Sequence, residues 1–207
     1  MRTEHPSSAA SRGEAFTLIE MMVVIAMVAM LVALSSFSIG SALSAQQLTS
    51  SSARFTNELA YAAQLAAREN RMVGVRFLRR EQEVGGGKSY FQGWQLMVPD
   101  RTTGKWRPFG EVNLLEKSTI MLGQEAWSTL LARSPLVNAS AVDDVDTTPP
   151  VFAFKPEGGT TLPRGASVPK WCVTLALATD WERSPDALPS NYRTLVLNAS
   201  TGAVVLY

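Results

Sequence analysis

Residues 16–40 read FTLIEMMVVIAMVAMLVALSSFSIG, and this stretch decides the organisation of the chain. Residues 21–34 contain no polar side chain, and Glu20 is the one charged residue of the whole stretch. As an α-helix, residues 16–39 would be ~36 Å long, which exceeds the ~30 Å hydrocarbon core of a bilayer. The sequence therefore predicts a hydrophobic helix that is long enough to cross a membrane, with a carboxylate near its start.

The residues before this stretch set its expected orientation. Residues 1–15 are mostly small or polar and contain Arg2 and Arg12, and the next basic residue after the stretch is Arg54. Basic residues are enriched on the cytoplasmic side of membrane spans. This asymmetry predicts residues 1–15 in the cytoplasm and the bulk of the chain on the opposite side of the membrane.

Three kinds of segment have this composition. A secretory signal peptide would end at a small-x-small cleavage site, such as the one formed by Ala42, Leu43 and Ser44. A plain transmembrane anchor is the second kind. Both leave Glu20 unexplained, because a carboxylate at membrane depth costs about 2–3 kcal/mol even on a lenient insertion scale. The third kind is a leader followed by a helix that keeps its carboxylate after cleavage, and it is considered because it gives Glu20 a role.

The third kind is indicated by residues 16–20, FTLIE, and the unbroken apolar run behind them. This pattern resembles the N-terminus of type IV prepilins and type II secretion pseudopilins. In that family a prepilin peptidase cuts directly before the Phe and N-methylates it, and a Glu is the fifth residue of the mature chain. The resemblance implies cleavage between Ala15 and Phe16 and N-methylation of Phe16, which makes Glu20 the fifth residue.

The resemblance also implies a way in which subunits assemble. Cleavage frees the amine of Phe16, and Glu20 of one subunit would meet the amine of a neighbour, since a carboxylate at low dielectric is tolerable when it is paired. Residues 1–15 would be the leader, and residues 16–40 the single transmembrane helix and filament core. The implied partners are prepilin peptidase, other pilin or pseudopilin subunits, and the lipid of the bacterial inner membrane.

The helical pattern continues beyond Gly40 with a different distribution of apolar residues. Residues 41–70 are more polar, and their apolar residues recur at spacings of seven, four, three and four: Leu48, Phe55, Leu59, Ala62 and Ala66. This periodicity predicts an amphipathic helix with one apolar face. We expect the helix to end near Asn70, where strand-like sequence begins.

Residues 71–207 predict a β-rich, periplasmic head. Alternating or apolar runs predict strands at residues 73–78, 90–98, 151–154, 171–178, 192–198 and 203–207, with one or two short strands within 106–124. Residues 79–88 and 134–150 are expected to be loops, and residues 124–133 a short helix. The fold class is therefore α+β, a long helix packed on an antiparallel sheet. This order resembles the H-type minor pseudopilins and the related Verru/Chthon cassette proteins.

The sequence contains no motif for a metal or a cofactor, and none is expected. Asp143, Asp144 and Asp146 carry oxygen ligands suited to Ca²⁺, but an EF-hand starting at Asp143 would need Gly and Glu where Thr148 and Phe154 stand. A solvated loop is the expected structure of this segment. The sequence leaves an irregular calcium site open.

Catalysis and nucleic-acid binding are not expected. The single histidine, His5, lies in the leader, so a chain cut before Phe16 has no histidine for general-base or zinc chemistry. The net charge of +1 and the scattered basic residues do not form a clear basic stripe. Two alternatives to a filament subunit remain open: a soluble periplasmic binding protein released near Ser44, and a DNA-binding minor pilin.

Overall fold

The computed structural model describes residues 17–81, 89–134, 149–165, 168, 170–185 and 187–207. For residues 34–41 and 81 it describes the backbone alone. The chain divides into two compact units, Met1–Ala42 and Leu43–Tyr207. Each unit is considered by itself below.

A single long helix, α1, runs from Leu18 to Glu69 and at 1.5 Å per residue is ~78 Å long. Its C-terminal end is closed by Asn70, which has a left-handed backbone with φ of 48°. The Asn70 N–H donates to the Ala67 carbonyl and the Arg71 N–H donates to the Ala66 carbonyl, which is the hydrogen-bond pattern of a Schellman motif. Asn tolerates this conformation better than most residues, so the expected end of the helix near residue 70 is confirmed.

The first unit contains the N-terminal part of α1. Its described residues with assigned exposure, 17–33 and 42, are all exposed. Among the residues that the structure describes, no helix meets the length and hydropathy that a membrane span requires.

The second unit contains an eight-stranded antiparallel sheet in the order β5-β1-β2-β4-β6-β7-β8, with β3 paired to β2. The strands are β1 (Val73–Glu81), β2 (Ser89–Pro99), β3 (Trp106–Leu114), β4 (Thr119–Met121), β5 (Phe152–Phe154), β6 (Trp171–Leu177), β7 (Tyr192–Leu197) and β8 (Val204–Leu206). The predicted α+β class, a helix followed by an antiparallel sheet, is confirmed.

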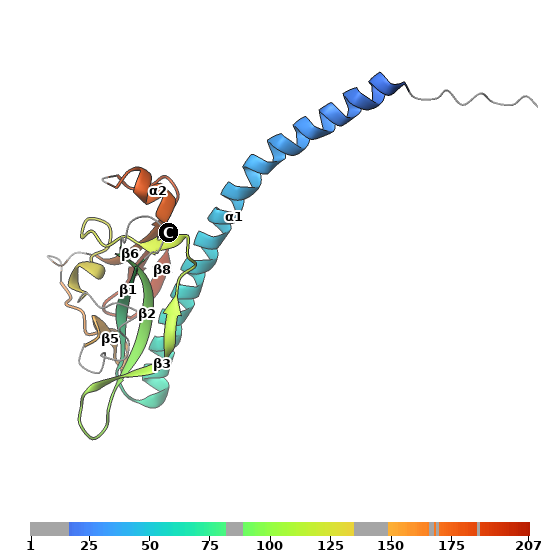
Figure 1. The fold of residues 1–207 in the computed structure, drawn as a ribbon. Helices are drawn as coiled ribbons and strands as arrows, with labels where there is room; N and C mark the ends of the chain where they lie inside the picture. The colour runs from blue at the N-terminus through green and yellow to red at the C-terminus, as the bar shows by residue number, and fades with distance from the viewer. Residues whose placement is uncertain (1–16, 82–88, 135–148, 166–167, 169, 186) are drawn as a thin grey trace, which may run out of the picture. The chain divides into compact units, whose positions relative to one another are not determined.

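The core of this unit lies between the sheet and the C-terminal part of α1 (Figure 1). The predicted apolar stripe is buried as a set, with exposed fractions of 2% or less: Leu48, Phe55, Leu59, Ala62 and Ala66. Polar contacts add to this packing, since Arg54 donates to the Asn113 side chain over 3.0 Å and Ser118 donates to Gln47 over 2.7 Å. All of the buried hydrophobic side chains found in the described residues belong to this second unit. It therefore has a hydrophobic core of its own.

Three local predictions in the head are wrong. Residues 79–81 continue β1 across an irregularity between Leu78 and Arg79, where a loop was expected. The expected helix at residues 124–133 is reduced to the 3-10 turn η1 (Leu131–Arg133). The expected strand to residue 178 stops at Leu177, and a short helix, α2 (Ala178–Arg183), follows it.

Tertiary hydrogen bonds explain the second difference. The Leu130 N–H donates to the Cys172 carbonyl, and the Thr174 N–H donates to the Ser128 hydroxyl. These bonds attach the segment before η1 to β6, and the first uses an N–H group that a regular helix would have paired internally. Local propensity is a weak preference that such contacts override.

Candidate assembly site

The candidate site is the start of α1, which is shaped by a helix cap. The Glu20 N–H donates to the Thr17 hydroxyl over 3.3 Å and to the Thr17 carbonyl over 3.1 Å. Thr17 is therefore the N-cap residue, and its side chain satisfies one of the backbone N–H groups that a helix start leaves without an intrahelical partner. The cap fixes the position at which the hydrophobic helix begins.

Thr17 and Glu20 have the spacing of a capping box, in which a Ser or Thr is followed three residues later by a Glu or Gln. The position of Glu20 after Phe16 identifies it in the sequence, whereas the role of Thr17 was not predicted. The signal was present in the sequence, because a Thr-x-x-Glu directly before an apolar run is a known mark of a helix start.

Glu20 lies in the first turn of α1 and is exposed. A negative charge in the first turn is favoured, because the helix dipole places partial positive charge there. In the part of the chain that the structure describes, the ion pairs join Arg68 and Arg71 to Glu69 and Arg183 to Asp180, and none includes Glu20. Its carboxylate is thus favoured by the helix dipole and open to a cation from outside the described residues.

The surface that follows Glu20 is apolar on every side of the helix. Leu18, Ile25 and Met30 are 79%, 67% and 67% exposed, and further large apolar side chains between them are exposed as well. Monomeric soluble proteins rarely expose contiguous apolar patches larger than a few hundred Å². A helix that is apolar all round is normally covered by protein or by lipid. The site therefore combines an exposed carboxylate in the first helical turn with a long surface that requires a cover.

Several residues predicted from the sequence cannot be placed. Ala15 and Phe16, the predicted cleavage and methylation positions, lie outside the described residues, as do Asp143, Asp144 and Asp146. Within the described residues, no group of His, Cys, Asp and Glu side chains is arranged to hold a metal ion. The spacing between Phe16 and Glu20 therefore rests on the sequence, and the position of Glu20 in the first turn rests on the structure.

Comparison with known proteins gives one family match. The family model of the prokaryotic N-terminal methylation motif matches residues 11–36. The solution structure of E. coli GspH is similar to this chain with a TM-score of 0.48 and 17% identity, covering 79% of this chain and 89% of that one. No curated protein sequence matches the chain. The chain therefore carries a prepilin-type N-terminal methylation motif at the start of a long helix, followed by an antiparallel sheet.

Proposed function

We propose that this chain is a structural subunit, a minor pilin or pseudopilin of a type IV pilus-like or type II secretion filament, rather than an enzyme. The observation that carries the proposal is the methylation motif at residues 11–36. The apolar surface of α1 supports it, because a filament core and a membrane are the two covers that such a helix requires. Release near Ser44 would remove Glu20 and most of this surface, and would give neither a role in the mature protein.

The proposal includes a maturation step and a location. Prepilin peptidase cuts between Ala15 and Phe16 and methylates the new amine of Phe16. Before assembly, residues 16–40 anchor the subunit in the inner membrane, with residues 1–15 in the cytoplasm and the head at residues 71–207 in the periplasm. The basic residues Arg2 and Arg12 support this orientation.

Glu20 sets the register between subunits in this proposal. The Thr17 cap fixes the start of the helix, and the helix dipole favours the negative charge of Glu20 in its first turn, at the end of the apolar surface. When that surface is covered by neighbouring helices, an unpaired carboxylate costs several kcal/mol. The ammonium of Phe16 on an adjacent subunit removes this cost only in the register that brings the two charges together. A misplaced subunit is therefore disfavoured.

The mature N-terminus tests the proposal. Intact mass and N-terminal peptide sequencing of protein from native membranes should give a chain that starts at N-methylated Phe16. A chain that starts near Ala45 in the soluble fraction would contradict both the processing and the filament role.

The role of Glu20 has a separate test with a matched control. Glu20→Gln keeps the side-chain shape and removes the charge, so we expect normal cleavage and loss of the subunit from sheared filaments. Glu125→Gln removes an exposed carboxylate of the head, and it should leave filament incorporation unchanged. Equal incorporation of both variants would show that the charge of Glu20 does not set the register.

A further inference from the structure

The last strand of the head leaves one edge of the sheet open. β8 is at the end of the strand order and pairs, among the described strands, with β7 alone. Thr194 and Tyr207 exchange both backbone hydrogen bonds, over 3.0 and 2.9 Å. In an antiparallel ladder the bonded pairs alternate, so the N–H and C=O groups of Val204 and Leu206 point away from β7. These outward groups form a short template for another strand.

The open edge lacks the usual protection against pairing. Natural edge strands are commonly blocked by Lys, Pro or an inward charge. Residues 203–207 read AVVLY and carry no charged side chain and no Pro. Val205, Leu206 and Tyr207 are 49%, 36% and 72% exposed. An extended chain can therefore reach the backbone of β8 and the side chains beside it.

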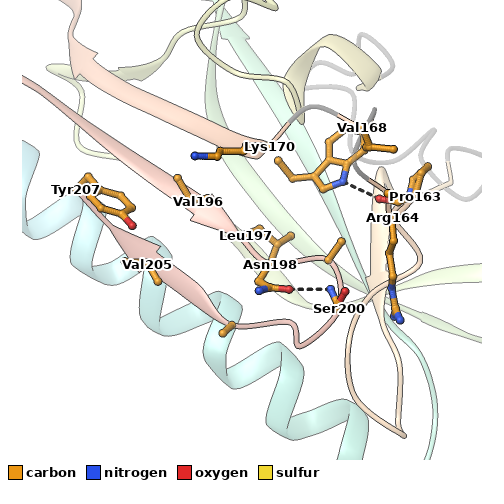
Figure 2. A pocket seen from close by; sticks show the side chains of 14 residues that line it. Pro163, Arg164, Val168, Lys170, Val196, Leu197, Asn198, Ser200, Val205 and Tyr207 are labelled. Atoms are coloured by element: carbon orange, nitrogen blue, oxygen red, sulfur yellow. Dashed lines mark hydrogen bonds between the residues drawn. The ribbon is translucent and has the colours of Figure 1, made fainter.

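A hollow of about 490 Å³ adjoins this edge. Figure 2 shows its side chains, with Val205 on β8, Tyr207 directly after β8, Val196 on β7, and Arg164 at the opposite end of the group. Val196 lies directly across from Val205 in the ladder. The β7–β8 side of the hollow is therefore apolar, which suits side chains of a strand laid beside β8.

Two basic side chains also line the hollow. Arg164 and Lys170 line it and are both exposed. A second hollow shares Arg164 and Ser200 with the first and adds Lys155, with Glu157 as the one acidic lining residue. None of the ion pairs found among the described residues includes Lys155, Arg164 or Lys170. Their combined charge favours an acidic partner.

The loop that carries Arg164 is held in place by the neighbouring turns. The Thr160 N–H donates to the Ala199 carbonyl over 3.0 Å, and the Trp171 indole N–H donates to the Pro163 carbonyl over 3.0 Å. These bonds attach residues 160–163, directly before Arg164, to the β7–β8 turn and to β6. Arg164 follows this attached segment directly and lines both hollows beside Ser200, at the end away from Tyr207.

We propose that this edge and its hollows bind an extended, acidic protein segment, which adds as a strand beside β8 and places carboxylates at Arg164 and Lys170. The backbone of Val204 and Leu206 supplies the main-chain hydrogen bonds, and the adjoining hollow selects the side chains, as in other cases of strand addition. That the segment belongs to a neighbouring filament subunit rests on the function proposed above. The binding itself does not depend on maturation at Phe16.

A nucleic acid fits this surface less well. Proteins that hold duplex DNA through its phosphates typically neutralise about six to ten of them, and the two hollows together offer Lys155, Arg164 and Lys170. The outward N–H and C=O groups of β8 alternate donors with acceptors. That alternation matches a peptide backbone and has no counterpart in a row of phosphates.

Binding of defined probes to the isolated second unit, which contains the head and the part of α1 packed on it, tests the proposal. The unit Leu43–Tyr207 contains its own core and is the protein to use. The probe is a short fluorescein-labelled peptide of alternating glutamate and valine, titrated by fluorescence anisotropy up to about 1 mM, the weak limit of specific binding. We expect saturable binding to the glutamate peptide, no binding to the same peptide with glutamine, and no binding to short duplex DNA at the same salt.

Variants separate the two parts of the site. The double variant Arg164→Gln, Lys170→Gln should lower the affinity for the glutamate peptide at least about tenfold. Arg80 is an exposed arginine of β1, and Arg80→Gln should leave the affinity unchanged. Leu206→Pro removes an outward N–H and keeps the bonds to β7, so it should abolish binding with little change in the circular dichroism spectrum. Amide resonances of Val204 and Leu206 should shift on titration of the unsubstituted head.

The outcomes that overturn the proposal are distinct. No binding of the glutamate peptide up to about 1 mM would reject the acidic site. Equal binding of the folded Leu206→Pro variant, or unshifted amides at Val204 and Leu206, would reject strand addition. Binding of duplex DNA without the peptide would assign the surface to nucleic acid instead. Each result is independent of whether the native chain starts at Phe16.

Discussion

The contribution of α1 packing to stability can be measured by replacing Phe55, which lies between the helix and the sheet. Its side chain is fully buried, and its ring centroid lies 4.8 Å from that of Trp94 and 6.0 Å from that of Phe77, the second in an edge-on arrangement. Replacing a buried Phe by Ala costs about 3–5 kcal/mol. Because Phe55→Ala also removes two aromatic pairs, each worth about 0.5–1.5 kcal/mol beyond area burial, we expect a loss of about 4–5 kcal/mol in the free energy of unfolding.

Urea unfolding of the unit Leu43–Tyr207, followed by tryptophan fluorescence, measures this loss. For a slope of about 2 kcal/mol per molar urea, the midpoint should fall by about 2 M. Total stabilities of domains are about 5–15 kcal/mol, so the variant should be marginally folded. The slope should stay the same, because the native and unfolded states expose similar areas.

Tyr61→Ala is the matched control for this experiment. Tyr61 is an aromatic residue of the same helix, is 42% exposed, and should change the stability by about 0.5 kcal/mol or less. A loss below about 1 kcal/mol for Phe55→Ala, or an equal loss for both variants, would refute the packing of the helix against the sheet. Phe55 is the decisive residue for this test, because its ring joins α1 to both β1 and β2.

Three further predictions concern single sites in the head. Asn70→Ala places a Cβ-bearing residue without a compensating side chain at φ of 48° and should cost about 1 kcal/mol in urea unfolding, whereas Asn70→Gly should cost nothing or stabilise. Gly159→Ala should lower the free energy of unfolding more than Gly104→Ala. Both glycines have positive φ, but a Cβ at Gly159 would lie 2.5 Å from the Ser200 carbonyl oxygen, whereas one at Gly104 meets nothing within 4 Å. Equal losses of stability in the two variants would contradict this. Burial and the hydrogen bond to Glu182 raise the pKa of Tyr90, so its stabilisation is present below pH of about 10 and is lost as the pH rises through the folded-state pKa. Ultraviolet titration should show a lower Tyr90 pKa in Glu182→Gln, and an unchanged value would contradict the contribution of Glu182.

The helix and its buried face could be predicted from the sequence, because both follow from local periodicity. Leu48, Phe55 and Ala66 recur at helical spacing, and their burial needed no knowledge of the sheet beyond its existence. The helix end near Asn70 was predicted from an equally local feature, the strand-like sequence that follows it, and the structure adds the positive φ of Asn70. In contrast, the extension of β1 through Glu81 depends on pairing with Ser89 across the hairpin. No property of residues 79–81 alone shows that pairing.

The candidate sites divide in the same way. Glu20 was found from its spacing to Phe16, and Thr17 was detectable from the capping-box pattern, so the assembly site is encoded in a short segment. The basic hollow was not detectable, because Arg164 and Lys170 are scattered among other basic residues in a chain of net charge +1. They face one hollow only because the β7–β8 turn and the segment after β5 are joined by hydrogen bonds such as that from Thr160 to Ala199.

The two parts of α1 meet different requirements with different side-chain patterns. Around Ile25 the helix is apolar and exposed on all sides, while around Phe55 a single stripe is buried and the remaining faces are polar or small. Residues without shared contacts contribute additively to stability, and Glu20 makes no contribution to the buried core of the head. Glu20→Gln should therefore abolish assembly with the unfolding midpoint of the head unchanged, and Phe55→Ala should lower that midpoint with cleavage before Phe16 unchanged. If one substitution altered both properties, the helix would couple assembly to head stability, and the division of its length into two independent surfaces would be wrong.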